Sequence, residues 1–168
     1  MGLVEAGVGL LPSGGGIAHM ARTQSGSNLC EMHRAIANGL MCDNAFEARE
    51  RGLLQDEDTI LLANDQLLPM AIEQLGSLME SWSDRPADFH IPAVGKKERS
   101  AMDQWIVDQV DRGCFTAHDA FLGRILTDVL CGNRDVKTAR KSEEVLALER
   151  QAFIRLYESE ETQLRIDH

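Results

Sequence analysis

Apolar residues recur at steps of three and four along most of this chain, the spacing of one face of an α-helix. Polar capping residues and glycines divide the pattern into separate helices. The clearest start is the capping box Thr116-x-x-Asp119, and Gly132 ends the helix that follows it. The pattern predicts helices over about 17–22, 28–39, 44–52, 67–82, 98–112 and 116–132, another from Ser142 onward, and one or two final turns.

Burial follows from the same spacing, since apolar periodicity is chiefly a burial signal. Helices from Asn64 onward are expected to form a bundle. The helix over 67–82 carries its apolar residues on one stripe, with Pro69 in its first turn. The side chains predicted to pack inside are Met102, Ile106, Val110, Leu122, Ile125, Leu126, Val129, Val145, Leu148, Ala152 and Leu156, together with the aromatic residues Trp105, Phe121, Phe153 and Tyr157.

The first sixteen residues follow a different pattern. Residues 3–11 are mostly apolar and predict a strand, and Pro12 with the glycines at 14–16 predicts a turn. A strand without a neighbouring strand exposes unpaired backbone groups, which favours association with another chain. We therefore expect a poorly anchored N-terminus, or self-association through this edge.

Two prolines and a glycine make residues 83–97 the clearest linker. The sequence accordingly predicts a first region over 1–82, a linker over 83–97 and a C-terminal helical region over 98–168. The fold class predicted is mainly α, with one or two residual strands followed by a helical bundle.

Composition and charge exclude several function classes. The chain has a net charge of −10, which disfavours nucleic-acid backbones and anionic lipid surfaces. No segment reaches the roughly 18 apolar residues of a membrane span. The four cysteines are widely spaced, which indicates reduced thiols in a cytoplasmic protein. Neither the Cys30–His33 nor the Cys114–His118 pair has the spacing of a closed zinc site, so no metal site is predicted.

Candidate chemistry lies in the opening stretch GLVEAGVGLLPSGGG. A dinucleotide fingerprint fails because Pro12 stands where its third glycine should be, and a phosphate-binding loop fails because Ile17 replaces its lysine. A third interpretation is that this stretch forms one side of an active site. There Glu5 would sit in an apolar environment that favours proton transfer, beside glycines that let a substrate approach the backbone. The alternative is that Glu5 is a solvated residue of an edge strand.

The same residues carry a resemblance. EAGVGLLPSGGG resembles the acid-x-x-x-Gly-x-x-Pro-x-x-Gly-Gly segment of the crotonase (enoyl-CoA hydratase/isomerase) superfamily, with Glu5, Gly9, Pro12, Gly15 and Gly16 on its marked positions. The stretch NAFEARERGLL is similar to a second segment of that family. Three stretches resemble a narrower group, namely the opening segment, IPAVGKK and the sequence of the last helix. That group consists of long bacterial β-oxidation proteins that join a 3-hydroxyacyl-CoA dehydrogenase to a C-terminal enoyl-CoA hydratase.

The resemblance implies a C-terminal fragment of a crotonase-type α/β superhelix, acting on 2-enoyl-CoA in fatty-acid β-oxidation. It implies Glu5 as one of two catalytic glutamates, and a substrate-binding segment of Gly9, Pro12, Gly14, Gly15 and Gly16. The other glutamate, two N–H groups for the thioester oxygen, and the NAD site of the dehydrogenase would lie upstream, so no cofactor is expected in this chain.

Because hydration needs two carboxylates and an oxyanion site, the 168-residue chain alone is expected to be inactive with crotonyl-CoA. Its affinity for acyl-CoA is expected to be weak or absent. The alternative function is a non-catalytic helical interaction or oligomerisation module. The acyl chain length that the parent enzyme prefers does not follow from these residues.

Overall fold

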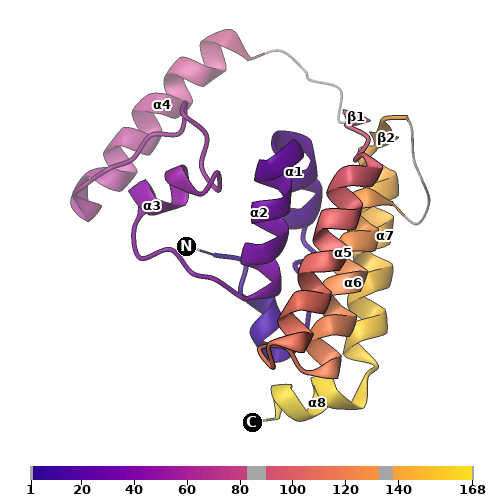
Figure 1. The fold of residues 1–168 in the computed structure, drawn as a ribbon. Coiled ribbons are helices and arrows are strands. Elements are labelled where there is room, and N and C mark those ends of the chain that lie inside the picture. The colour runs from indigo at the N-terminus through magenta and orange to yellow at the C-terminus, as the bar shows by residue number, and fades with distance from the viewer. Residues whose placement is uncertain (1, 83–89, 133–137, 168) are drawn as a thin grey trace.

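The computed structural model describes residues 2–82, 90–132 and 138–167. Its architecture is mainly α, as predicted, with helices packed side by side and one short antiparallel pair of strands (Figure 1). The elements are, in chain order, the 3₁₀ helix η1 (Glu5–Val8), α1 (Gly16–Thr23), α2 (Gly26–Ala37), α3 (Ala45–Glu50), the 3₁₀ helix η2 (Asn64–Gln66), α4 (Leu67–Ser81), β1 (His90–Ile91), α5 (Lys96–Asp111), α6 (Ala117–Cys131), β2 (Arg140–Lys141), α7 (Ser142–Tyr157) and α8 (Glu160–Ile166).

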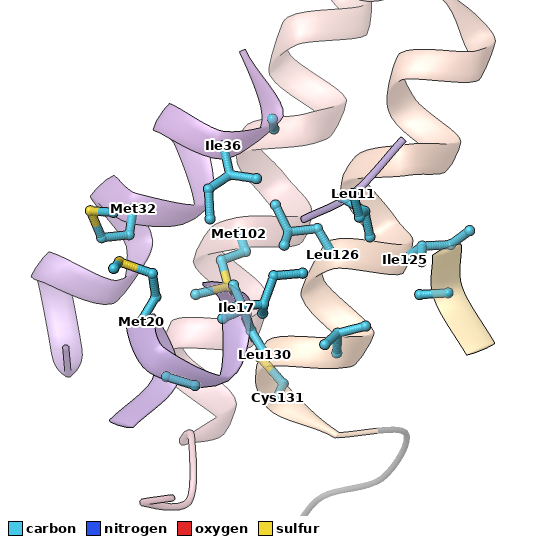
Figure 2. Close-up of a cluster of buried hydrophobic side chains, with 14 of the residues drawn as sticks. Leu11, Ile17, Met20, Met32, Ile36, Met102, Ile125, Leu126, Leu130 and Cys131 are labelled. Atoms are coloured by element: carbon cyan, nitrogen blue, oxygen red, sulfur yellow. Dashed lines mark hydrogen bonds between the residues drawn. The ribbon is translucent and has the colours of Figure 1, made fainter. Parts of the chain in front are cut away.

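The core forms where α1 and α2 pack against α5, α6 and α7. Figure 2 shows its centre, with Ile17, Ile36, Met102 and Leu126 among the side chains that fill it. α6 contributes most, because buried residues occupy nearly every side of its second half. The core therefore draws on both the 1–82 and the 98–168 stretches. The division of the chain into two regions stays a prediction, and residues 83–89 of the proposed linker lie outside the described residues.

The helix boundaries follow the local signals. Asn44 caps α3 by accepting from the N–H of Glu47, and both hydrogen bonds of the Thr116–Asp119 capping box are present at the start of α6. Pro69 lies in the first turn of α4, as predicted. Most residues predicted to lie inside are buried or half-buried. Val110 and Tyr157 are exceptions, with exposed fractions of 40% and 50%.

The strand predicted over residues 3–11 is wrong. Glu5–Val8 form a 3₁₀ helix, in which the N–H of Gly7 donates to the carbonyl of Val4 and the N–H of Gly9 to that of Ala6, each at 3.0 Å. Only Gly2 makes an isolated bridge, with Met41. The two residual strands are instead β1 and β2, which pair His90 with Lys141 and Ile91 with Arg140.

The N-terminal segment is also anchored, contrary to the expectation of a loose edge. Ala6, Leu11 and Pro12 are buried, and the Thr162 hydroxyl of α8 donates to the carbonyl of Gly9 at 3.0 Å. α8 is itself held to α6 by an ion pair in which Arg165 Nη1 lies 2.8 Å from Asp119 Oδ1. Association through an unpaired N-terminal strand therefore has no structural basis in the described residues.

α4 is a second correction. The helix exists where the pattern predicts it, but it lies apart from the bundle (Figure 1), and its described side chains are exposed except for the half-buried Met70. The bundle thus consists of α1, α2, α5, α6 and α7, and not of the helices from Asn64 onward. No helix among the described residues combines the length and apolar character that crossing a membrane requires.

Candidate functional site

Glu5 opens the 3₁₀ helix η1 and is half-buried. Its side-chain oxygen Oε2 is buried and has no hydrogen-bond partner among the described residues. Burying a polar atom without a partner costs free energy, so this oxygen lacks the hydrogen bond that an interior carboxylate oxygen normally has. The prediction that Glu5 is catalytic is not tested by this geometry and stays a prediction.

Gly9 ends η1 in the left-handed region, with a φ of +80°. A Cβ built at this position would lie 2.8 Å from Thr162 Oγ1 and 3.0 Å from His118 Nε2. Glycine is required here both by the backbone angle and by the close approach of α6 and α8. Gly9 therefore has a structural reason to be glycine, and its predicted role in substrate binding stays a prediction.

The loop after Leu11 turns the chain into α1. Pro12 is buried, Gly14 is exposed with open space where a Cβ would lie, and Gly15 is the N-cap of α1 with a φ of +92°. Gly16 is packed more tightly, with Pro12 Cβ 3.3 Å from the position of its missing Cβ. Of these predicted substrate-binding residues, Gly14 offers the most open backbone to a ligand.

A carboxylate that the sequence interpretation gave no role occupies the start of α1. Glu149 of α7 is fully buried, and its Oε2 accepts from the N–H of Gly15 at 3.0 Å while its Oε1 accepts from the N–H of Ala18. Unpaired N–H groups make a helix N-terminus an anion-binding position. Here an internal carboxylate fills it, and it joins two elements that lie 134 residues apart in the chain.

The surroundings of Glu149 act on its pKa in opposite directions. Burial raises the pKa, while the N–H groups of Ala18, Gly15 and Ile17 lower it, and the result is a pKa above the ordinary value. One sequence signal was present: Glu149 lies on the apolar stripe of α7, beside Val145 and Ala152. Its partner could not be deduced from that stripe.

The glycine loop does not fit a dinucleotide. A pyrophosphate binds at a helix N-terminus through the same N–H groups that Glu149 already accepts from. An entering phosphate would have to displace a buried carboxylate of the same charge sign.

Other buried polar groups serve packing. His33 of α2 is fully buried, with Nε2 3.2 Å from the Gly123 carbonyl and 3.0 Å from Thr127 Oγ1. Burial lowers its pKa to about 4, so the ring is neutral near pH 7. Trp105 packs edge-to-face against it, with ring centroids 5.7 Å apart. His33 therefore ties α2 to α5 and α6.

Neither cysteine of the Cys30–His33 and Cys114–His118 pairs is in a disulfide, and the Cys30 thiol donates to the Glu98 carbonyl. Burial raises the pKa of Cys30, and Cys114 is exposed. Within residues 2–82, 90–132 and 138–167, no three His, Cys, Asp or Glu side chains gather closely enough to hold a metal ion.

A surface pocket of about 580 Å³ lies between α2 and the segment around α3. Its lining mixes Arg34, Arg49 and Arg51 with Glu31, Glu50 and Asp56. Arg34 is paired with Glu31, and Arg51 with Glu47. The opposite charges on this wall balance one another, so the pocket shows no preference for an anionic or a cationic ligand.

Comparison with known proteins identifies a similar protein. The chain is 30% identical, over 175 aligned residues, to a protein described as a probable 3-hydroxyacyl-CoA dehydrogenase of Bacillus subtilis (strain 168). The match covers 100% of this chain and 22% of the relative, so the chain spans about a fifth of the relative's length. No protein-family model matches the chain, and no solved structure does.

The resemblance of the opening segment to the crotonase superfamily is not supported by these comparisons and stays a prediction. What they do support is coarser. Over its whole length, this chain is similar to a region of a protein described as a probable 3-hydroxyacyl-CoA dehydrogenase.

Proposed function

We propose that this chain is the enoyl-CoA-handling part of a fatty-acid β-oxidation enzyme, in a parent that also oxidises 3-hydroxyacyl-CoA with NAD. The whole-length similarity to a probable 3-hydroxyacyl-CoA dehydrogenase is the main support for the substrate class. Hydration of an enoyl-CoA yields a 3-hydroxyacyl-CoA, which is the substrate named for that relative. The two reactions therefore share a ligand.

Glu5 is the residue proposed to act on that ligand. Its carboxylate is half-buried, with one oxygen that has no partner among the described residues, and we propose that this oxygen accepts a proton from water or bonds a 3-hydroxyl. The exposed backbone at Gly14 is proposed to lie beside the acyl chain or the thioester. NAD has no part in this proposal for the loop, because Glu149 occupies the start of α1.

Binding of 3-hydroxybutyryl-CoA and butyryl-CoA to the 168-residue chain, measured by calorimetry, tests this function. A hydrogen bond to a charged group contributes about 1.5–3 kcal/mol when its partner is otherwise unpaired, roughly a tenfold to hundredfold difference in affinity. We expect the hydroxylated ligand to bind more tightly, and Glu5→Leu to remove that preference while leaving butyryl-CoA binding unchanged.

Glu57→Leu is the matched control, since Glu57 is an exposed carboxylate in the turn after α3. It should keep the preference for the hydroxyl group. Failure of both acyl-CoAs to bind at millimolar concentration would overturn the proposal that this chain by itself binds the acyl-CoA. Equal affinity of the wild-type chain for the two ligands would overturn the role of Glu5.

A second candidate function is a helical interaction or oligomerisation module. The exposed apolar side chains of α4 are the observation that favours it. Its test is the state of association of the chain, which does not depend on any acyl-CoA.

A further inference from the structure

α4 presents a continuous row of apolar side chains to solvent. Leu68, Ile72, Leu75 and Met79 have exposed fractions of 69%, 61%, 57% and 71%, and Trp82 just beyond the helix is 69% exposed. A soluble monomer rarely exposes a contiguous apolar surface of this kind without a use for it. A helix of 15 residues is also marginal in water unless it packs against something.

The spacing of this row is that of a coiled-coil seam. From Leu68 to Trp82 the steps are four, three, four and three, which keeps every member on one line between two paired helices. In heptad terms, Ile72 and Met79 take the a positions, and Leu68, Leu75 and Trp82 take the d positions. Among parallel coiled coils, Ile at a with Leu at d favours two strands over three or four, and Ile72 with Leu75 fits that combination.

The opposite side of α4 faces its own chain. Among the described side chains of α4, Met70 is half-buried, and the Gln74 side-chain amide donates to Thr59 Oγ1 of the preceding segment at 2.5 Å. Both residues lie at outer heptad positions, away from the row from Leu68 to Trp82. The orientation of α4 therefore leaves the seam open and uses the other side for intramolecular contacts.

Charge indicates what can cover the seam. The only charged residues of α4 are Glu73 and Glu80, and both take the outer b position. The flanking e and g positions inside the helix carry Pro69, Ala71, Gly76 and Leu78, none of them charged. A second α4 can therefore approach without placing like charges face to face, and the small side chains at 71 and 76 permit close contact.

We propose that two copies of this chain associate through α4, as a parallel two-stranded coiled coil related by a twofold axis. Each copy supplies the same row to the other, as a symmetric interface requires. This inference deepens the second candidate function and is independent of acyl-CoA chemistry. Failure to dimerise would leave the calorimetric test of Glu5 unaffected, and the reverse also holds.

Sedimentation equilibrium of the full chain over a range of concentrations tests the dimer. The wild-type chain should reach twice its 18.6 kDa mass and dissociate on dilution. Leu75→Glu, in the seam, should raise the dissociation constant at least tenfold. Leu67→Glu is the matched control, because Leu67 is equally exposed on α4 but lies off the seam, and it should dimerise like the wild type.

A charge exchange tests the parallel register. Position 71 of one copy would lie beside position 76 of the other. The double variant Ala71→Glu/Gly76→Glu and the double variant Ala71→Lys/Gly76→Lys should each be monomeric, because like charges would face each other across the seam. An equimolar mixture of the two double variants should form a mixed dimer, because opposite charges would then face each other.

Circular dichroism and thermal unfolding should show the bundle intact in every variant, since α4 lies outside the core. A wild-type chain that stays monomeric would overturn the proposal. Equal loss of association in Leu67→Glu and Leu75→Glu would also overturn it. So would the absence of a dimer in the mixture of the Glu and Lys double variants.

Discussion

At the scale of single residues, buried polar side chains hold distant parts of the chain together. Glu149 joins α7 to the start of α1, Thr162 joins α8 to Gly9, and His33 joins α2 to α6. Each makes hydrogen bonds in a place without water, where losing a partner costs more than the bond contributes in solution. Neither Glu149 nor Thr162 stood out in the sequence, because the partner that explains each lies more than 130 residues away.

Replacing Glu149 by Gln should destabilise the fold. The two carboxylate oxygens accept from different N–H groups, and an amide would turn a donor toward one of them. We expect a loss of about 1–3 kcal/mol in the free energy of unfolding, measured by urea denaturation near pH 5. Glu143→Gln, on the exposed side of the same helix, should change it by less than about 0.5 kcal/mol.

The cost of Glu149→Gln should also depend on pH. The pKa of Glu149 is raised in the folded state, so the stability linked to its proton is complete below the unfolded value and is lost as pH rises through the folded value. As pH rises, the wild type loses this proton-linked part of its free energy of unfolding, whereas the Gln variant does not titrate and keeps its stability. The difference between them should shrink from pH 4 to pH 7, and a difference that grows would contradict the raised pKa.

At the scale of elements, capping decides where helices begin. Asn44, Thr116 and Ser159 each accept from an N–H at the start of α3, α6 and α8. These signals are local in the sequence, which is why the starts of α3 and α6 could be predicted. Ser25 precedes α2 as N-cap but makes no such side-chain bond. Residue type alone therefore does not establish that a cap forms.

Thr116→Ala should cost more than Ser25→Ala. The first change removes a side chain that accepts from Asp119 N and also contacts Arg165, whereas the second removes no capping bond. We expect losses of about 0.5–2 kcal/mol for Thr116→Ala and a few tenths for Ser25→Ala in thermal unfolding. Equal losses would show that the capping box of α6 contributes nothing specific.

At the scale of the whole molecule, the C-terminal helix α8 packs against the N-terminal segment around η1. α8 contacts η1, its Thr162 bonds the Gly9 carbonyl, and its Arg165 pairs with Asp119 of α6. The two ends of the chain therefore depend on one another for order. Glu5 belongs to the segment that this contact positions, so α8 helps to position the candidate site.

Thr162→Val should loosen that segment. Valine keeps the shape of threonine and removes the hydroxyl that donates to Gly9. We expect a loss of about 1–3 kcal/mol in stability. Hydrogen exchange should become faster over residues 5–11 and stay unchanged in α5. Uniformly faster exchange through the bundle would instead indicate a general loss of core packing.

The sequence by itself determined the mainly helical class, most helix boundaries and the faces on which apolar residues gather. These depend on contacts within one helical turn and on caps that lie three residues from their partners. The capping box at Thr116 and the stripe of α6 are examples. The glycines at 15 and 52 were also recognisable as turn or helix-end positions, and both have a positive φ, whereas Gly9, which also has one, was predicted to lie in a strand.

Only the tertiary structure decided which apolar faces are buried. α4 and α6 carry similar apolar stripes, yet the stripe of α6 is buried in the core and that of α4 is exposed to solvent. Burial of a helix face depends on which other helices pack against it and not on the spacing of its own apolar residues. The same holds for residues 3–11, whose apolar run suggested a strand until packing against α8 and α2 favoured a 3₁₀ turn. Glu149 shows the principle most clearly: its partner lies at the other end of the chain, and no local pattern encodes that distance.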